Sequence, residues 1–145
     1  MSEDHFSLSE FTCKDGTPYP DEWVHTRFPD LHRLLERIRL ACGSHPVTIL
    51  CGYRTVEYNQ KLRDRGLKGE RHATGVALHS QHTEGRAADI VVFGTPTKVV
   101  HGIIMEQYEA GHLPELGGVG LYDGLGFVHV DTWKLANGHL RHWSG

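Results

Sequence analysis

Residues 117–133 read Gly-Gly-Val-Gly-Leu-Tyr-Asp-Gly-Leu-Gly-Phe-Val-His-Val-Asp-Thr-Trp, and they predict a β-hairpin. Two runs rich in β-branched and aromatic residues, 118–122 and 127–133, flank a short turn at 123–126 that holds two glycines. A hairpin joins neighbouring strands in antiparallel order. The segment therefore favours an antiparallel sheet over the parallel sheet of a doubly wound protein.

Upstream of the hairpin, helices and strands are interspersed. Hydrophobic periodicity, with glycine and proline at the ends of segments, predicts helices over 30–42, 55–65 and 95–110. The same signals predict strands over 47–51 and 87–92. Asp30 and Thr95 are the expected N-terminal caps of the first and third helices, and Gly66 is the expected end of the second. The apolar faces are expected to hold Val56, Asn59 and Leu62 in the second helix, and Val99, Val100, Ile103, Ile104 and Tyr108 in the third.

The remaining segments predict little regular structure. Pro18, Pro20 and Pro29 predict an irregular lead-in over residues 1–29, and three glycines predict a long loop over 66–81. The whole pattern predicts an α+β protein, with a small antiparallel sheet flanked by helices. With 145 residues, the chain is expected to form a single domain over 1–145, with its motifs concentrated in about 50–143.

Composition excludes several classes of protein. Hydrophobic residues make up 39% and charged residues 23%, which is typical of a soluble globular domain. The formal net charge of -3 disfavours a nucleic-acid partner, because such proteins neutralise phosphates with excess Lys and Arg. No apolar run approaches the roughly 20 residues that span a bilayer, so no membrane partner is expected. The first five residues do not resemble a secretory signal, which predicts synthesis in the cytoplasm.

Cysteine and histidine are the residue types with metal-binding or nucleophilic chemistry. The three cysteines, Cys13, Cys42 and Cys51, cannot all pair and form no Cys-x-x-Cys, so reduced and mostly buried thiols are expected. A cysteine peptidase built on Cys51 is disfavoured, because no histidine is placed by spacing to activate that thiol. Histidine is frequent, with 12 in the chain, but abundance alone is weak evidence for a metal.

Three side chains form a candidate metal site. His82 lies just before the strand predicted at 87–92, Asp89 lies on that strand, and His129 lies on the second strand of the hairpin. Two imidazoles and one carboxylate leave a fourth tetrahedral position open, which is typical of catalytic zinc. By spacing alone, ordinary histidines at strand ends are the default interpretation.

Several short motifs strengthen the metal interpretation, because they follow one another along the chain in the same order as in a known protein family. They are Cys51–Arg54, Glu57–Asn59, Ser80–Ile90, Gly117–Tyr122, Phe127–Thr132 and Arg141–Trp143. On these motifs the chain resembles peptidase family M15, the zinc D-Ala-D-Ala carboxypeptidases. Within it, the branch of small peptidoglycan endopeptidases and phage endolysins is the most similar. The resemblance implies the fold shared with the signalling domain of hedgehog proteins, and it implies that His82, Asp89 and His129 bind Zn²⁺.

The resemblance also implies catalytic residues. Arg54 matches the arginine that reaches the substrate, where a guanidinium can hold a carboxylate or a developing oxyanion. Many family members carry an acid three residues before the last histidine, but this chain has Gly126 there. Asp131 shares a strand face with His129 and is the favoured general base or orienting residue. Asp123, in the turn, is the other candidate, with a plain Asp-Gly turn as its alternative.

The expected function is a monomeric zinc metallopeptidase, a carboxypeptidase or endopeptidase, that hydrolyses peptide bonds in peptidoglycan stems or cross-links. The absence of a signal sequence predicts a phage-type endolysin that is made in the cytoplasm and acts on the cell wall after release. The alternative is a catalytically inactive, zinc-containing binding module of the same fold, which the glycine at position 126 favours.

Overall fold

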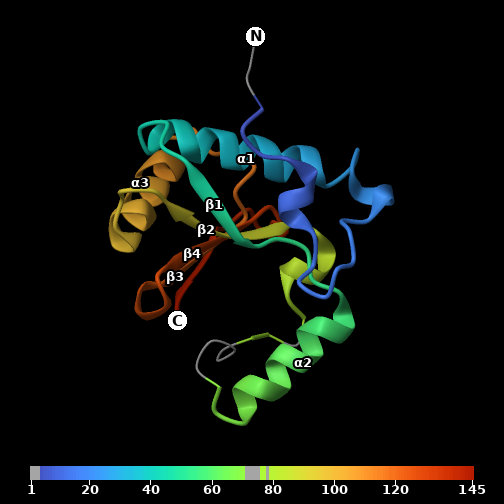
Figure 1. Cartoon of the computed structure of the whole chain (residues 1–145). Coiled ribbons are helices and arrows are strands. Elements are labelled where there is room, and N and C mark those ends of the chain that lie inside the picture. The colour runs from blue at the N-terminus through green and yellow to red at the C-terminus, as the bar shows by residue number, and fades with distance from the viewer. Residues whose placement is uncertain (1–3, 71–75, 78) are drawn as a thin grey trace.

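The computed structural model describes residues 4–70, 76, 77 and 79–145. Its centre is a five-stranded sheet in the order β1-β2-β4-β3-β5. The strands are β1 (Val47–Cys51), β2 (Ala87–Val92), β3 (Gly118–Tyr122), β4 (Phe127–Asp131) and β5 (Arg141–Ser144). The helices are α1 (Phe28–Ala41), α2 (Val56–Leu67) and α3 (Thr97–Glu109). Figure 1 shows α1 and α3 beside the sheet, with α2 set apart from it.

The sheet has one apolar face and one polar face, because side chains alternate along its strands. On β2 and β4, Ala88, Ile90, Val128 and Val130 are buried in the hydrophobic core, where α1 and α3 pack. The intervening residues of both strands point to the opposite face. Antiparallel pairing places Asp89 opposite His129 in register. The sheet thereby holds two polar side chains from distant parts of the sequence against each other on the face away from the hydrophobic core.

The predicted α+β architecture is confirmed. The hairpin predicted at 117–133 forms β3 and β4, which pair antiparallel from Gly118↔Asp131 to Tyr122↔Phe127. Only β5 departs from the antiparallel pattern, since it lies parallel to β3. The sequence analysis missed β5, because its four residues, Arg-His-Trp-Ser, lack the apolar alternation typical of a strand. None of the helices in the described residues is long and apolar enough to cross a membrane.

The lead-in is more ordered than predicted. Phe6, Phe11 and Tyr19 are buried in the core, and two 3-10 helices, Leu8–Phe11 and Asp21–Trp23, lie among them. The Phe11 and Phe28 rings meet edge to face at 5.0 Å between centroids. The prediction that Pro29 breaks a helix was wrong: α1 begins at Phe28 with this proline in its first turn, where no backbone N–H is required.

The helix boundaries and faces also differ in detail. Thr55, the predicted first residue of the second helix, is the N-cap of α2, its hydroxyl accepting from the Tyr58 N–H at 3.1 Å. The helix continues past the predicted end at Gly66 to Leu67. Val56 is exposed, since α2 has little core against it, and Asn59 is the buried residue. Pro96 rather than Thr95 occupies the N-cap of α3. Its buried residues are Val100 and Ile104, four apart, whereas Val99 is 48% exposed. Of the loop predicted at 66–81, residues 71–75 and 78 lie outside the described residues.

Gly117, just before β3, lies against the backbone that follows β4. A Cβ at Gly117 would lie 1.9 Å from the Trp133 carbonyl oxygen, a backbone atom that cannot rotate away. We expect Gly117→Ala to lower the free energy of unfolding by about 3 kcal/mol through overpacking. Gly102→Ala is the matched control. It adds a methyl in open space on α3 and is expected to raise stability by about 1 kcal/mol. Urea unfolding of both variants measures the difference, and equal stabilities would contradict the close packing at Gly117.

Candidate metal centre

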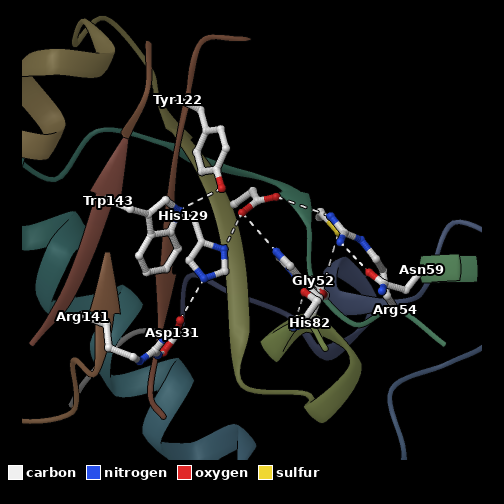
Figure 2. A network of polar contacts seen from close by, with 12 residues as sticks. Gly52, Arg54, Asn59, His82, Tyr122, His129, Asp131, Arg141 and Trp143 are labelled. Atoms are coloured by element: carbon white, nitrogen blue, oxygen red, sulfur yellow. Dashed lines mark hydrogen bonds and ion pairs between the residues drawn. The ribbon is translucent and has the colours of Figure 1, made fainter. Parts of the chain in front are cut away.

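The three predicted metal ligands converge although they come from three different elements. His82 lies in the 3-10 helix Gln81–Glu84, Asp89 in β2 and His129 in β4. The His82 Nε2 and the His129 Nδ1 lie 3.1 Å and 3.0 Å from the same atom, the Asp89 Oδ1. Figure 2 shows the His82 and His129 side chains, with dashed lines that mark their polar contacts. All three side chains are buried.

The outer nitrogen of each imidazole also has an oxygen partner. The His82 Nδ1 lies 2.7 Å from the Gly52 carbonyl oxygen, and the His129 Nε2 lies 2.9 Å from the Asp131 Oδ2. A neutral imidazole carries a single N–H and cannot donate to oxygens on both sides. A cation between the inner nitrogens and Asp89 would satisfy this arrangement, with the outer N–H held by its oxygen, as is typical of metal-bound histidines. The donor set therefore fits a divalent metal.

The charged groups of the site shift one another's pKa values. Burial alone would lower the pKa of His82, but the Asp89 carboxylate raises it to about 10. Burial likewise opposes the charged form of His129, but Asp131 and Asp89 raise its pKa above the usual value. Burial would raise the pKa of Asp89, but the two imidazoles hold it well below its usual range. Asp89 is thus a buried negative charge that positive charge must compensate.

Asp131 is placed to orient His129. Its side chain is completely buried, and its Oδ2 meets the His129 ring. Its Oδ1 accepts from the Trp133 N–H at 3.1 Å and from the Arg141 guanidinium. Both carboxylate oxygens are therefore engaged. Of the two roles predicted for Asp131, general base and orienting residue, this arrangement suits the orienting role.

Asp123 lies apart from these groups. It sits in the 3-10 helix Asp123–Leu125, about half exposed, with its Oδ2 3.6 Å from the Lys98 Nζ. A cavity lies over the candidate metal centre. Among the described residues, Tyr122 and Leu125, which are close to Asp123 in sequence, line this cavity, whereas Asp123 does not. The structure therefore does not bring Asp123 together with the other predicted site residues.

Arg54 does join the site. Its backbone N–H donates to the His82 carbonyl oxygen at 3.0 Å, and its Nη2 lies 3.9 Å from the Asp89 Oδ2. Its Nη1 donates to the Asn59 Oδ1 at 3.0 Å, and the Asn59 amide in turn donates to the Ala77 carbonyl oxygen at 2.8 Å. The side chain of Arg54 is only 11% exposed. Asn59 thus links the arginine to the wall of the cavity, a role that the sequence analysis missed.

Cys51 is closer to this group than predicted. One ligand atom each from Cys51, His82 and Asp89 lies within 4.8 Å of the other two. Sequence spacing placed no histidine to activate this thiol, but the fold brings His82 close to it, because the end of β1 lies against the 3-10 helix Gln81–Glu84. Burial raises the pKa of Cys51, but His82 and Arg54 lower it more, so that it lies below its usual value. As predicted, all three cysteines are free.

A cavity of about 750 Å³ lies over the metal centre. Part of its wall is aromatic and comes from Tyr58, Tyr122, Phe127, Trp133 and Trp143. The Trp143 indole N–H donates to the Tyr122 hydroxyl at 2.9 Å, and its ring lies 5.2 Å from that of His129. Arg141 and Trp143 share one face of β5. The sequence analysis quoted this segment as a motif but gave its residues no role.

Comparisons with known proteins show the family to which the chain belongs. The profile of the family described as peptidoglycan L,D-endopeptidase MepK matches residues 18–143. Peptidoglycan L,D-endopeptidase MepK of Escherichia coli K12 is 33% identical over 116 residues, which are 79% of this chain and 53% of the relative. A probable peptidoglycan L,D-endopeptidase MepK of Haemophilus influenzae is 32% identical over 124 residues, 84% of this chain and 56% of the relative. The chain spans about half the length of these curated relatives. The chain belongs to peptidase family M15, and within it to the family described as peptidoglycan L,D-endopeptidase MepK.

Proposed function

We propose that this protein is a zinc-dependent peptidoglycan endopeptidase that hydrolyses a peptide bond between an L- and a D-configured residue. The observation that carries the proposal is the shared Asp89 oxygen, with an imidazole nitrogen about 3 Å away on each side and an oxygen behind each ring. Family membership supports the peptidase chemistry, and the names of the relatives support the bond type and the endopeptidase rather than the carboxypeptidase alternative.

His82, Asp89 and His129 are the residues that would hold the metal. When bound, Zn²⁺ supplies a Lewis acid that polarises the scissile carbonyl and lowers the pKa of water. Asp89 provides the negative charge, and the two imidazoles provide neutral nitrogen donors whose orientation is set by Gly52 and Asp131. Cys51 is the competing donor, because its sulfur also lies near His82 and Asp89.

Arg54 and the aromatic wall are the groups that would bind substrate. The guanidinium of Arg54 points to the centre of the site and lies on the cavity wall, where its donors can stabilise an oxyanion or a stem-peptide carboxylate. Among the described residues, the Arg54 Nε is buried without a hydrogen-bond partner. The tyrosine and tryptophan side chains line the same cavity and can pack against the apolar parts of a stem peptide.

Asp131 acts in this proposal as a positioning residue for His129. We expect Asp131→Asn to weaken zinc binding by about 10- to 100-fold, the usual cost of losing an outer carboxylate partner. A chelator competition titration measures the affinity, and Asp123→Asn is the matched control that should leave it unchanged. Unchanged zinc affinity in Asp131→Asn with a large loss of kcat would contradict the positioning role and make Asp131 the general base.

Mass spectrometry of products tests the proposed function. Purified sacculi are digested with the zinc-loaded protein, with and without chelator, and the released muropeptides are sequenced. The proposal expects chelator-sensitive cleavage at a bond from an L- to a D-residue. Zinc-loaded protein that binds sacculi but cuts no bond would instead support the inactive binding module. Loss of only a terminal D-Ala would identify a carboxypeptidase.

The proposed biological setting is lysis by a phage-type endolysin, and it needs its own test. The protein is added from outside to Gram-negative cells that chloroform has made permeable, and turbidity is followed with and without a chelator. Rapid, chelator-sensitive clearing supports lytic use. Cleavage of purified sacculi without clearing would contradict the lytic setting and leave the peptidase proposal intact.

A further inference from the structure

A second group of metal-ligating side chains lies on the N-terminal segment and α1. It consists of Asp4, His5, His32 and Glu36, here called the N-terminal cluster. The His32 Nε2 lies 2.7 Å from the Asp4 Oδ1 and 3.3 Å from the Glu36 Oε2. The His5 Nδ1 lies 2.7 Å from the Glu36 Oε1, and the His5 backbone N–H donates to the Glu36 Oε2 at 2.8 Å. The cluster shares no residue with the metal centre.

The fold holds the cluster together in two ways. His32 and Glu36 are four residues apart on α1, so their side chains lie on the same face of the helix. Phe6 is buried in the core and fixes the segment that carries Asp4 and His5. Phe6 and Phe28 also contact the His32 ring, the first edge to face and the second stacked at 5.7 Å between centroids. The imidazole is thus oriented by packing and not only by its polar partners.

The spacing of the donor atoms suits a small divalent ion. Ligand atoms of Asp4, His32 and Glu36 all lie within 4.8 Å of one another. Two donors that bind tetrahedral zinc at about 2.0–2.1 Å lie roughly 3.3 Å apart. The His32–Glu36 separation of 3.3 Å matches this value, and the His32–Asp4 separation of 2.7 Å would have to widen around an ion. An imidazole among two carboxylates favours zinc over calcium or magnesium, which prefer oxygen donors alone. The two carboxylates supply the charge that a dication neutralises.

We propose that the N-terminal cluster is a second zinc site, which ties residues 4 and 5 to α1. His32, Asp4 and Glu36 bind the ion, and His5 contacts Glu36 beside them. The site lies outside the proposed catalytic centre, so the zinc-loaded protein carries two ions per chain rather than one. Its role is structural, because it joins the N-terminal segment to the helix that covers the sheet.

Metal stoichiometry tests the proposal. Protein without a histidine tag is stripped of metal with a chelator and dialysed against Zn²⁺. Its zinc content per chain is then measured by elemental mass spectrometry. The wild type is expected to bind two equivalents, and His32→Ala and Glu36→Gln one each. His25→Ala, which removes an exposed histidine outside the cluster, is the matched control and should retain two. The double variant Asp89→Ala/His129→Ala should retain one equivalent, which His32→Ala then removes.

The same set of variants separates failure of this proposal from failure of the catalytic one. One equivalent in the wild type that survives His32→Ala but is lost in Asp89→Ala/His129→Ala would overturn the N-terminal site and leave the catalytic site standing. Two equivalents that both survive His32→Ala and Glu36→Gln would also overturn it. Circular dichroism of each variant confirms folding, so that a lost ion is assigned to a lost ligand.

Discussion

Asp89→Ala is expected to abolish peptidoglycan hydrolysis and zinc binding at the metal centre together. Asp89 supplies the oxygen that both imidazoles face and a buried negative charge between them. Loss of the metal removes several kcal/mol of transition-state stabilisation, so activity should fall by a factor on the order of 10³ or more. The measurements are the rate of muropeptide release and the zinc content of the same preparation.

Two controls make this result specific. Cys51→Ser changes the competing sulfur donor and is expected to keep zinc and activity, whereas His129→Ala should lose both. Retained folding of Asp89→Ala, monitored by circular dichroism, excludes collapse of β2 as the cause. Full activity of Asp89→Ala, or of wild-type protein in excess chelator, would rule out the metal-dependent mechanism.

Arg54→Gln is expected to lower kcat/KM by about 10²- to 10³-fold while the zinc content stays at the wild-type level. The expected loss is that of a preorganised donor to developing negative charge. Arg54 points to Asp89 from a distance of 3.9 Å but is not itself a metal donor, so activity and metal binding should separate in this variant. Steady-state kinetics on a soluble cross-linked muropeptide, together with metal analysis, measures both quantities.

Arg54→Lys and Asn59→Leu refine the test. Lysine keeps the charge but loses the paired donors, so it should restore only part of the activity. Asn59→Leu keeps the arginine but removes the Asn59 carbonyl oxygen that accepts from its Nη1, and a smaller loss is expected. If Arg54→Gln loses zinc as well as activity, or if it keeps wild-type kcat/KM, the substrate-binding role of Arg54 is wrong.

The sequence predicted the structure best where a local turn signal also determines which strands pair. The hairpin turn at 123–126 predicts antiparallel β3 and β4, and the alternation along β4 places His129 and Asp131 on one face. That Asp89 lies directly opposite His129 depends on the register between β2 and β4, which no local pattern specifies. The resemblance to family M15 supplied that connection before the structure did.

Other features depend on contacts between distant residues. The surroundings of Asp131 include Arg141, ten residues later on a strand without a strand-like pattern, so its full burial could not be inferred from spacing. The core positions of Phe6 and Phe11 were not predicted. The prolines of the lead-in indicate irregular backbone, but irregular backbone can still place side chains in the core. Cys51 and His82 meet only because β1 and the segment before β2 are brought together by the fold.

Anomalous diffraction at the zinc edge, from crystals of the zinc-loaded protein, tests the central claim most directly. The account predicts a peak in the metal centre within bonding distance of the His82 Nε2, the Asp89 Oδ1 and the His129 Nδ1. A peak held by Cys51 and His82 without His129, or no peak among these residues at full zinc loading, would contradict it.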